Sequence, residues 1–550
     1  MHEASNLIYL RFFMQLKSSK QTLFLCLLVF AAALPAVFFR DLSPINELNY
    51  IAAAQDAIDN NRFFSFFEDG KPFTQTPPLY MWICMVAILF EGLPTSSIML
   101  FLNVFSLIGI ILILDLNFGK MLRLNYRNKA TVMVVSMPFM MTAALLAQPI
   151  VLFSLLVVAA VCYIKQRAEL FIIEQEVSVD TGNIAIPLLI FAAIFTNGVL
   201  GLFIPLFTLV MVLYTLKKLK LFFKILPLSY FFIIGFLVFL WATLTLIEAG
   251  SAYTLRLFIQ EPYLRLIGKI GSSHNFAFYF FAFWMLSFPL GISAAYAAIK
   301  IIISERRQID LSAIFAISIP VATLILISIP SSKDVTYVFA SLPSLAYFLV
   351  YYSQKYGSRD KFLKLTFVLG LLPFGLLFFA YFYVKREIPC LNSIYVISSL
   401  LFLMLFSALA MFKVSRSSAT DGIATFGVGV LVMTFTVGFA MPEINKSVSY
   451  NSVAEALDQK IEESNNFNIC YIGINNPWTL KLYNKDMNLQ LSTHDNINLD
   501  YCRNNFRIIG RSALRDHQDL NELKNLKNAR MYGDTLLISP ENTKEETKDE

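Results

Sequence analysis

The sequence contains few charged residues for its length. Only 15% of its 550 residues are Asp, Glu, Lys or Arg, whereas 57% are hydrophobic and 52 are phenylalanine. Soluble globular chains carry about 25% charged residues, and they could not bury this much apolar surface. The shortage of charge therefore excludes a soluble protein and predicts a chain that crosses a membrane several times.

Residues that bind metals are also sparse. The chain has four histidines and six cysteines, and no group of them has the spacing of a metal site. We therefore predict no metal and no other cofactor. Cys470 and Cys502 lie in the polar C-terminal region. If this region lies outside the cytoplasm, the two cysteines can form a disulfide. The sequence alone leaves open whether they do.

The net charge of +6 is spread over short clusters that alternate with apolar runs. The clusters lie at 120–129, 165–167, 217–224, 300–307, 355–364 and 413–416. Basic residues near span ends stay in the cytoplasm, so two crossings separate successive clusters. This pattern predicts about 13 transmembrane helices, with the N-terminus inside and the C-terminus outside. It excludes nucleic acid as a partner, because nucleic-acid binders gather basic charge on one folded face.

The predicted fold class is an all-α polytopic membrane domain with interfacial helices, followed by a small extracytoplasmic α/β domain. We expect a cytoplasmic N-terminus at 1–21, a membrane domain at 22–440 with outer loops at 40–97 and 250–274, an α/β domain at 441–540, and a disordered tail at 541–550. The apolar run 79–90 is too short to span, and its crossing would break the charge rule. It is therefore predicted to be an interfacial helix, with a second one at 46–59 and the return crossing at 98–116.

The C-terminal region has short β-like runs that alternate with helical patterns. We predict strands at 468–474, 506–509 and 535–538, and helices at 453–464 and 520–528. Such alternation is typical of a small α/β domain of about 100 residues.

Two motifs in the first outer loop and one later motif combine polar, turn-forming and aromatic residues. Residues 44–50 read Pro-Ile-Asn-Glu-Leu-Asn-Tyr, residues 70–82 read Gly-Lys-Pro-Phe-Thr-Gln-Thr-Pro-Pro-Leu-Tyr-Met-Trp, and residues 332–337 read Ser-Lys-Asp-Val-Thr-Tyr. These motifs resemble those of the C-type membrane glycosyltransferases, in the family 39-like branch that contains protein O-mannosyltransferases and bacterial aminoarabinose transferases. The resemblance covers about residues 20–440, and it implies a multi-pass protein of the bacterial inner membrane.

The sequence departs from this family's pattern where charge is expected. The first loop of the family reads Pro-Asp-Glu-x-Arg-Tyr, and a Glu-Lys pair precedes its Pro-Pro. Here the aspartate and the arginine are Asn46 and Asn49, and the Glu-Lys pair is Gln75-Thr76. Gln148 and Asn197 likewise replace an expected aspartate and lysine. An amide cannot accept a proton near pH 7, so this loss of charge weakens the case for catalysis.

The resemblance implies transfer of a sugar from a polyprenyl-phosphate donor to a lipid, glycan or protein acceptor on the extracytoplasmic face, as in lipid A or cell-envelope glycan modification. Glu47 is the candidate base, and Asn46 would orient the acceptor. The expected substrate-binding residues are Asn49, Tyr50, Lys71, Gln75, Thr76, Tyr80, Gln148, Asn197, Arg256, Arg265, His274, Lys333 and Tyr337. The alternative is a catalytically inactive relative that binds the carrier lipid or regulates a partner transferase.

Each candidate also has a simpler interpretation. Glu47 could be an ordinary carboxylate on an amphipathic helix, and Lys333 and Tyr337 could anchor helix ends at the level of the lipid headgroups. Arg256 and Arg265 could meet anionic headgroups, and His274 could be an interfacial hydrogen-bonding residue.

Overall fold

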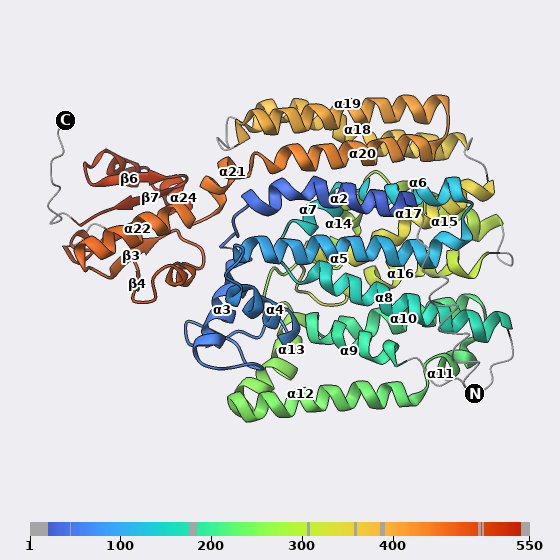
Figure 1. The fold of residues 1–550 in the computed structure, drawn as a ribbon, viewed down its shortest axis with the longest axis horizontal. Coiled ribbons are helices and arrows are strands. Elements are labelled where there is room, and N and C mark those ends of the chain that lie inside the picture. Colours follow the sequence, from blue (N-terminus) through green and yellow to red (C-terminus); the bar gives the residue numbers. More distant parts are fainter. Residues whose placement is uncertain are drawn as a thin grey trace.

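Helices make up most of the described residues before residue 450. The computed structural model describes residues 20–44, 46–174, 184–304, 309–356, 360–385, 391–492, 497 and 500–540. The predicted disordered tail and most of the predicted cytoplasmic N-terminus lie outside these residues. The long helices run nearly parallel in one bundle, and a small sheet domain is attached at one end of it (Figure 1).

The bundle consists of long apolar helices and several shorter ones. They are α2 (Lys20–Phe39), α5 (Thr95–Phe118), α6 (Leu124–Val135), α7 (Pro138–Ala144), α8 (Ile150–Glu169), α9 (Ala185–Asn197), α10 (Leu200–Thr215), α11 (Phe222–Ile225), α12 (Leu228–Leu255), α14 (Phe278–Leu286), α15 (Gly291–Ser304), α16 (Leu311–Ser328), the 3-10 helix η5 (Val335–Ser341), α17 (Pro343–Tyr356), α18 (Lys361–Val384), α19 (Ile394–Arg416) and α20 (Ala419–Gly438).

Eight helices in the described part of the chain are long and apolar enough to cross a membrane, and there are ten such spans if the bent pairs α14–α15 and η5–α17 each count as one. Helices α9 and α10 are also apolar but are shorter than these spans, so the count of 13 crossings stays a prediction. The all-α polytopic fold class is confirmed, and the chain is an integral, multi-pass membrane protein.

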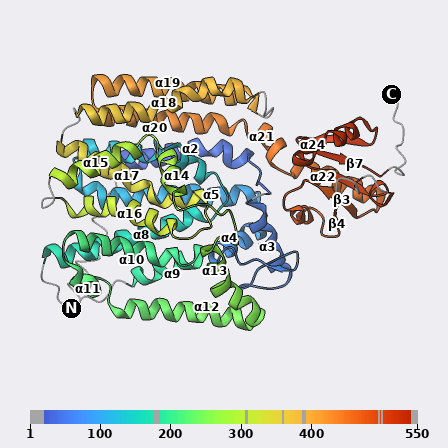
Figure 2. The same ribbon diagram turned by 180° about the vertical axis from the view of Figure 1, so that it is seen from behind.

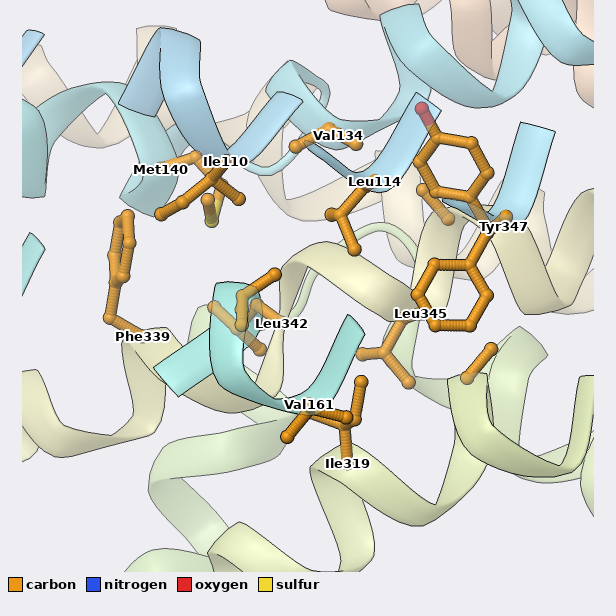
Figure 3. Packing of buried hydrophobic residues seen from close by; sticks show 14 of the residues in the cluster. Ile110, Leu114, Val134, Met140, Val161, Ile319, Phe339, Leu342, Leu345 and Tyr347 are labelled. Atoms are coloured by element: carbon orange, nitrogen blue, oxygen red, sulfur yellow. The ribbon is translucent and has the colours of Figure 1, made fainter. Parts of the chain in front are cut away.

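The middle of the bundle is closely packed. Figure 3 shows Ile110, Leu114, Val134, Val161, Ile319 and Tyr347 meeting there from α5, α6, α8, α16 and α17, and all six side chains are buried. Outer helices present large apolar side chains outward, as α12 does with Phe232 and Ile247. Because lipid is as apolar as these side chains, close packing and not exclusion of water holds such helices together.

The predicted first outer loop contains two short helices, as expected. These are α3 (Leu48–Asp59) and α4 (Pro78–Leu89), and they are followed by α5, the helix expected to make the return crossing. Between α3 and α4, strands β1 (Phe67–Glu68) and β2 (Lys71–Pro72) form a hairpin. Its turn residues Asp69 and Gly70 both have positive φ angles, the conformation that two-residue hairpin turns require.

The second predicted outer loop, 250–274, is helical from its first residue to Leu266, and its position outside the membrane stays a prediction. α12 continues to Leu255 through a kink at Gly250, whose φ of 77° favours glycine. A π-helical turn, η4 (Arg256–Gln260), and α13 (Glu261–Leu266) follow. Residues 271–274 then form a loop that pairs with the segment before η5.

The C-terminal region contains a five-stranded sheet in the order β4-β3-β5-β7-β6. Strands β3 (Asn468–Ile472), β5 (Phe506–Ile509) and β7 (Thr535–Ile538) confirm the predicted ones, and α22 (Asn451–Ser464) confirms the first predicted helix. The second predicted helical segment is a 3-10 helix, η8 (Gln518–Asn525), and strands β4 (Asn488–Leu491) and β6 (Ala529–Tyr532) were not predicted. A disulfide joins Cys470 to Cys502, the pairing that the sequence left open.

The sheet domain lies at the end of the bundle that carries α3, α4 and α13. Figures 1 and 2 show this arrangement from opposite sides, with α21 (Met441–Val448) leading from α20 into the domain. The first outer loop therefore lies between the bundle and the domain, and the predicted site residues of this loop are gathered there.

Candidate functional site

Five segments that are far apart in the sequence meet at this end of the bundle. They are α3, the residues just before α4, the end of α9, helix α13, and the start of η5. The site described below is built from side chains of these segments.

Tyr50 on α3 stands at the centre of an aromatic group. Its ring contacts the rings of Phe73 and Tyr80 edge-on, with centroids 5.9 and 5.3 Å apart. Its hydroxyl hydrogen-bonds the buried side chain of Thr76, and burial raises the pKa of the phenol above its ordinary value. The Tyr80 side chain is fully buried, and its hydroxyl has no hydrogen-bond partner among the described residues.

Arg265 on α13 is held by a carboxylate one helical turn earlier. Its Nε donates to Glu261 at 3.0 Å, and the other oxygen of Glu261 accepts from the hydroxyl of Thr74, also at 3.0 Å. Glu261 is only 5% exposed, whereas the Arg265 side chain is 32% exposed. The pair therefore ties the first outer loop to α13 and keeps the guanidinium accessible.

Tyr337 of η5 joins the same cluster. Its hydroxyl hydrogen-bonds Asn197 at the end of α9, and it interacts electrostatically with Arg265, as does Tyr50. A backbone hydrogen bond holds Tyr337 close to Arg265. The N–H of Ser332, five residues before Tyr337, donates to the carbonyl of Arg265 at 3.0 Å. The structure thus brings together five predicted substrate-binding residues: Tyr50, Thr76, Asn197, Arg265 and Tyr337.

Lys333 lies near this cluster but is directed to backbone groups. Its ammonium donates to the carbonyls of Ser328, at 2.6 Å, and Ile327, at 3.4 Å, at the C-terminal end of α16. The side chain is buried, and burial lowers the pKa of this lysine. The ammonium therefore hydrogen-bonds carbonyls that have no partner within the helix, and its charge is attracted to the negative end of the helix dipole.

Glu47, the candidate base, is enclosed. It is 1% exposed, and its carboxylate accepts hydrogen bonds from Arg40 and from the backbone N–H groups of Ser43 and Ala147, each at 2.7 Å. These contacts fix the start of α3 against the turn between α7 and α8. Gln148 follows in the same turn, and its carbonyl accepts from Asn103 at 3.2 Å. The catalytic role of Glu47 stays a prediction, and its surroundings are those of a structural ion pair.

The other predicted site residues lie around the cluster. Asn49 and Gln148 are half-buried, and Oδ1 of Asn49 has no partner in the described part of the chain. His274 is exposed, and its ring stacks on Phe278 at 4.5 Å. The remaining residues are exposed: Asn46, Lys71, Gln75 and Arg256.

The sequence-based prediction missed three residues that fix the loop in place. Glu248 on α12 accepts from the backbone N–H groups of Phe63 and Phe64 at 2.6 and 2.7 Å. The hydroxyl of Tyr253 bonds the backbone of Phe66 and Phe73, and Glu261 holds Thr74. The only signal for any of them was the spacing of Glu261 four residues before Arg265, which is typical of a helical ion pair.

The sheet domain binds the first outer loop directly. The indole N–H of Trp478 donates to Glu68, and Lys481 and Lys485 pair with Asp69 and Asp59 at 2.9 and 2.7 Å. Burial raises the pKa of Glu68 to about 7, against the opposing effect of the Trp478 hydrogen bond. The hairpin β1–β2 is therefore held between the bundle and the domain.

The cluster presents hydrogen-bond donors with one accessible cation. An arginine beside phenol, hydroxyl and amide groups suits an anion such as a phosphate group. No group of three or more metal-ligating side chains occurs in the described ranges. The two buried carboxylates nearby, Glu47 and Glu261, both accept hydrogen bonds from an arginine and from a second donor.

No protein-family model and no curated protein matches the sequence. Solved structures do match. The crystal structure of ArnT from Cupriavidus metallidurans bound to undecaprenyl phosphate has a TM-score of 0.69 at 13% identity, and its apo form has 0.68 at 12%; each match covers 94% of this chain and 97% of ArnT. The archaeal oligosaccharyltransferase AglB from Archaeoglobus fulgidus, in complex with an inhibitory peptide and a dolichol-phosphate, has a TM-score of 0.46 at 12% identity over 90% of this chain and 70% of AglB, and we draw no argument from it. The ArnT likeness confirms the predicted C-type glycosyltransferase fold.

Proposed function

We propose that this protein binds a polyprenyl-phosphate-linked sugar at the cluster of Tyr50, Arg265 and Tyr337 and transfers the sugar to a lipid, glycan or protein acceptor. The observation that carries the proposal is the convergence of these three side chains from separate segments, around a guanidinium that remains 32% exposed. The fold supports it, because an ArnT structure of the same fold holds undecaprenyl phosphate.

The chemistry of the donor fits this cluster. When the bond between sugar and phosphate breaks, negative charge grows on the phosphate, and a fixed cation with hydroxyl donors stabilises that charge. Arg265 supplies the cation, and Tyr50 and Tyr337 supply the hydroxyls. Glu261 is a positioning residue for Arg265, and Glu47 positions α3. We further propose that the site faces the outside of a bacterial inner membrane, under the sheet domain.

A second candidate function is binding of the carrier lipid without transfer, as a regulatory partner of another transferase. The observation that favours it is that the carboxylates at the site are already engaged in hydrogen bonds. Glu47 and Glu261 are both buried and hydrogen-bonded, and the position of the family aspartate is occupied by the exposed Asn46. A carrier-binding protein needs the phosphate site but no base.

Binding of undecaprenyl phosphate to the purified full-length protein tests the first step. We expect Arg265→Gln to weaken binding at least about tenfold, because a charge-assisted contact to phosphate is lost. Lys269→Gln is the control, since Lys269 is an exposed cation shortly after α13 and is not a predicted site residue. Equal loss in both variants, or no loss in either, would rule out the proposed site.

Turnover distinguishes the two functions. The protein is incubated in vesicles with undecaprenyl-phosphate sugars, and release of free undecaprenyl phosphate is measured. Release that depends on Arg265 supports transfer. Binding without any release, in wild type and in Asn46→Asp alike, supports the carrier-binding function.

A further inference from the structure

A groove lies at the end of the bundle opposite the sheet domain, away from the site described above. It has a volume of about 620 Å³ and lies where α19 ends and α20 begins, beside α6. In Figure 1 α20 reaches the sheet domain through α21, so its first residues lie at the far end of the bundle. Both α19 and α20 are long and apolar enough to cross a membrane.

The mouth of the groove is basic. Lys413 and Arg416 line it from the last turn of α19, and Lys129 of α6 pairs with Asp421 at 2.6 Å. Asp421 is the only carboxylate among the lining residues that the structure describes. Its pairing with Lys129 leaves the charges of Lys413 and Arg416 in excess.

Neither of these two cations forms a salt bridge in the described part of the chain, although Lys413 interacts electrostatically with Asp421. Lys413 donates to the neutral hydroxyl of Thr425 at 3.0 Å. The guanidinium of Arg416 lies over the ring of Phe412, 4.3 Å from its centroid, and the side chain is exposed. A guanidinium placed on an aromatic face keeps its N–H groups free to bind an anion.

The deeper part of the groove is apolar. Val132 of α6 and Val428 of α20 line it, each farther along its helix from the basic end than Lys129 and Asp421 are. A ligand that fits this order has an anionic group at one end and a hydrocarbon chain that continues along the helices into the membrane. A free phosphate would use only the mouth.

We propose that this groove binds an anionic phospholipid of the leaflet opposite the sheet domain, with its phosphate at Lys413 and Arg416 and an acyl chain along Val132 and Val428. The site is separate from the proposed carrier site and independent of it. The charge rule places this face in the cytoplasm, where anionic headgroups and basic side chains near the surface attract one another.

The test uses the delipidated full-length protein in detergent, titrated with phosphatidylglycerol or with phosphatidylcholine of the same acyl chains. Native mass spectrometry counts the bound lipid. We expect the double variant Lys413→Gln, Arg416→Gln to bind phosphatidylglycerol about 10- to 30-fold more weakly and phosphatidylcholine unchanged. The control Lys220→Gln, Lys224→Gln removes two exposed lysines from the same face and should change neither affinity.

Equal phosphatidylglycerol affinity of the double variant and wild type would overturn the proposal. So would competition by inorganic phosphate or glycerol phosphate at the concentration at which phosphatidylglycerol binds, since the occupant would then be a free anion. If the double variant does not fold, Arg416→Gln alone and a salt series on wild type replace it. Phosphatidylglycerol affinity that does not change with salt would contradict the proposed ionic contact.

Discussion

The carboxylate of Glu47 accepts a hydrogen bond at 2.7 Å from the backbone N–H of Ala147, which lies 100 residues later in the chain. The contact joins the start of the first outer loop to the turn between α7 and α8. Arg40 and Ser43 complete the surroundings of this carboxylate. Glu47 therefore determines where α3, and with it Tyr50, stands in the site.

Replacement of Glu47 by alanine should lower the free energy of unfolding by about 3–5 kcal/mol, because Arg40, whose side chain is only 12% exposed, loses its partner. Thermal unfolding of the purified protein measures this loss. Asn46→Ala is the control, since that side chain is exposed and should change stability by about 0.5 kcal/mol or less. Equal stability of the two variants would show that the ion pair contributes little.

Removal of the Tyr337 hydroxyl by Tyr337→Phe should weaken binding of undecaprenyl phosphate by about 2- to 10-fold, the range of one hydrogen bond. The ring and its packing remain, so the effect isolates the hydroxyl. Tyr263→Phe, at an exposed tyrosine on α13, should leave the affinity unchanged. An unchanged affinity in Tyr337→Phe would remove Tyr337 from the phosphate site.

Lys333→Met should cost about 1–2 kcal/mol of stability, because the carbonyls at the end of α16 lose their donor. Its effect on undecaprenyl phosphate binding should stay within about twofold, since the ammonium is directed to those carbonyls. Both quantities are measured beside Lys269→Met, an exposed lysine of the same region. A large loss of affinity at unchanged stability would instead assign Lys333 to the phosphate.

Burial of Glu68 beside Trp478 should make docking of the sheet domain depend on pH. Burial raises the pKa of Glu68 from 4.5 to about 7, so the docked state binds more protons than the undocked state between these values. Stability from this group is present below about pH 4.5 and is lost as the pH rises through about 7.

Unfolding temperatures measured from pH 5 to 8 should therefore fall by about 1–3 °C more in wild type than in Glu68→Gln. The glutamine can still accept from Trp478 but does not titrate. Glu91→Gln, at an exposed carboxylate, should follow the wild-type curve. Parallel curves for wild type and Glu68→Gln would contradict the predicted shift.

The disulfide between Cys470 and Cys502 should stabilise the sheet domain by about 3–4 kcal/mol, since it closes a loop with a sequence separation of 32. Reduction, or replacement of both cysteines by serine, should speed limited proteolysis within 468–540 and leave the helical bundle intact. Equal cleavage rates with and without reductant would show that the bond adds no stability.

The sequence predicted the fold well because hydrophobic runs, basic clusters and short motifs are local signals. It placed α3, α4 and α5 close to their observed bounds, and it predicted Arg265 and Tyr337 as site residues. It could not show that Glu47 and Lys333 are directed to backbone groups, because the partners Ala147 and Ser328 contribute only main-chain atoms. Almost every residue type carries the same main-chain N–H and C=O groups, so such partners leave no pattern in the sequence.

The sequence did not show the helical conformation of 250–266 for a related reason. Its charged residues Arg256, Glu261 and Arg265 belong to η4 and α13, at the end of the bundle where the site lies. Glu261 is buried there because Thr74 and Arg265 supply its partners from two directions. Tertiary contacts of this kind cannot be deduced from one segment alone.

The hairpin that carries Glu68 and Lys71 is fastened on one side by Trp478 and on the other by Tyr253. Displacing it would therefore break the contacts with Trp478 and Tyr253 together. A bulky ligand that has to displace this hairpin to enter or leave can exchange no faster than these contacts break. Variants that weaken the hydrogen bond from Trp478 to Glu68 should therefore speed the exchange.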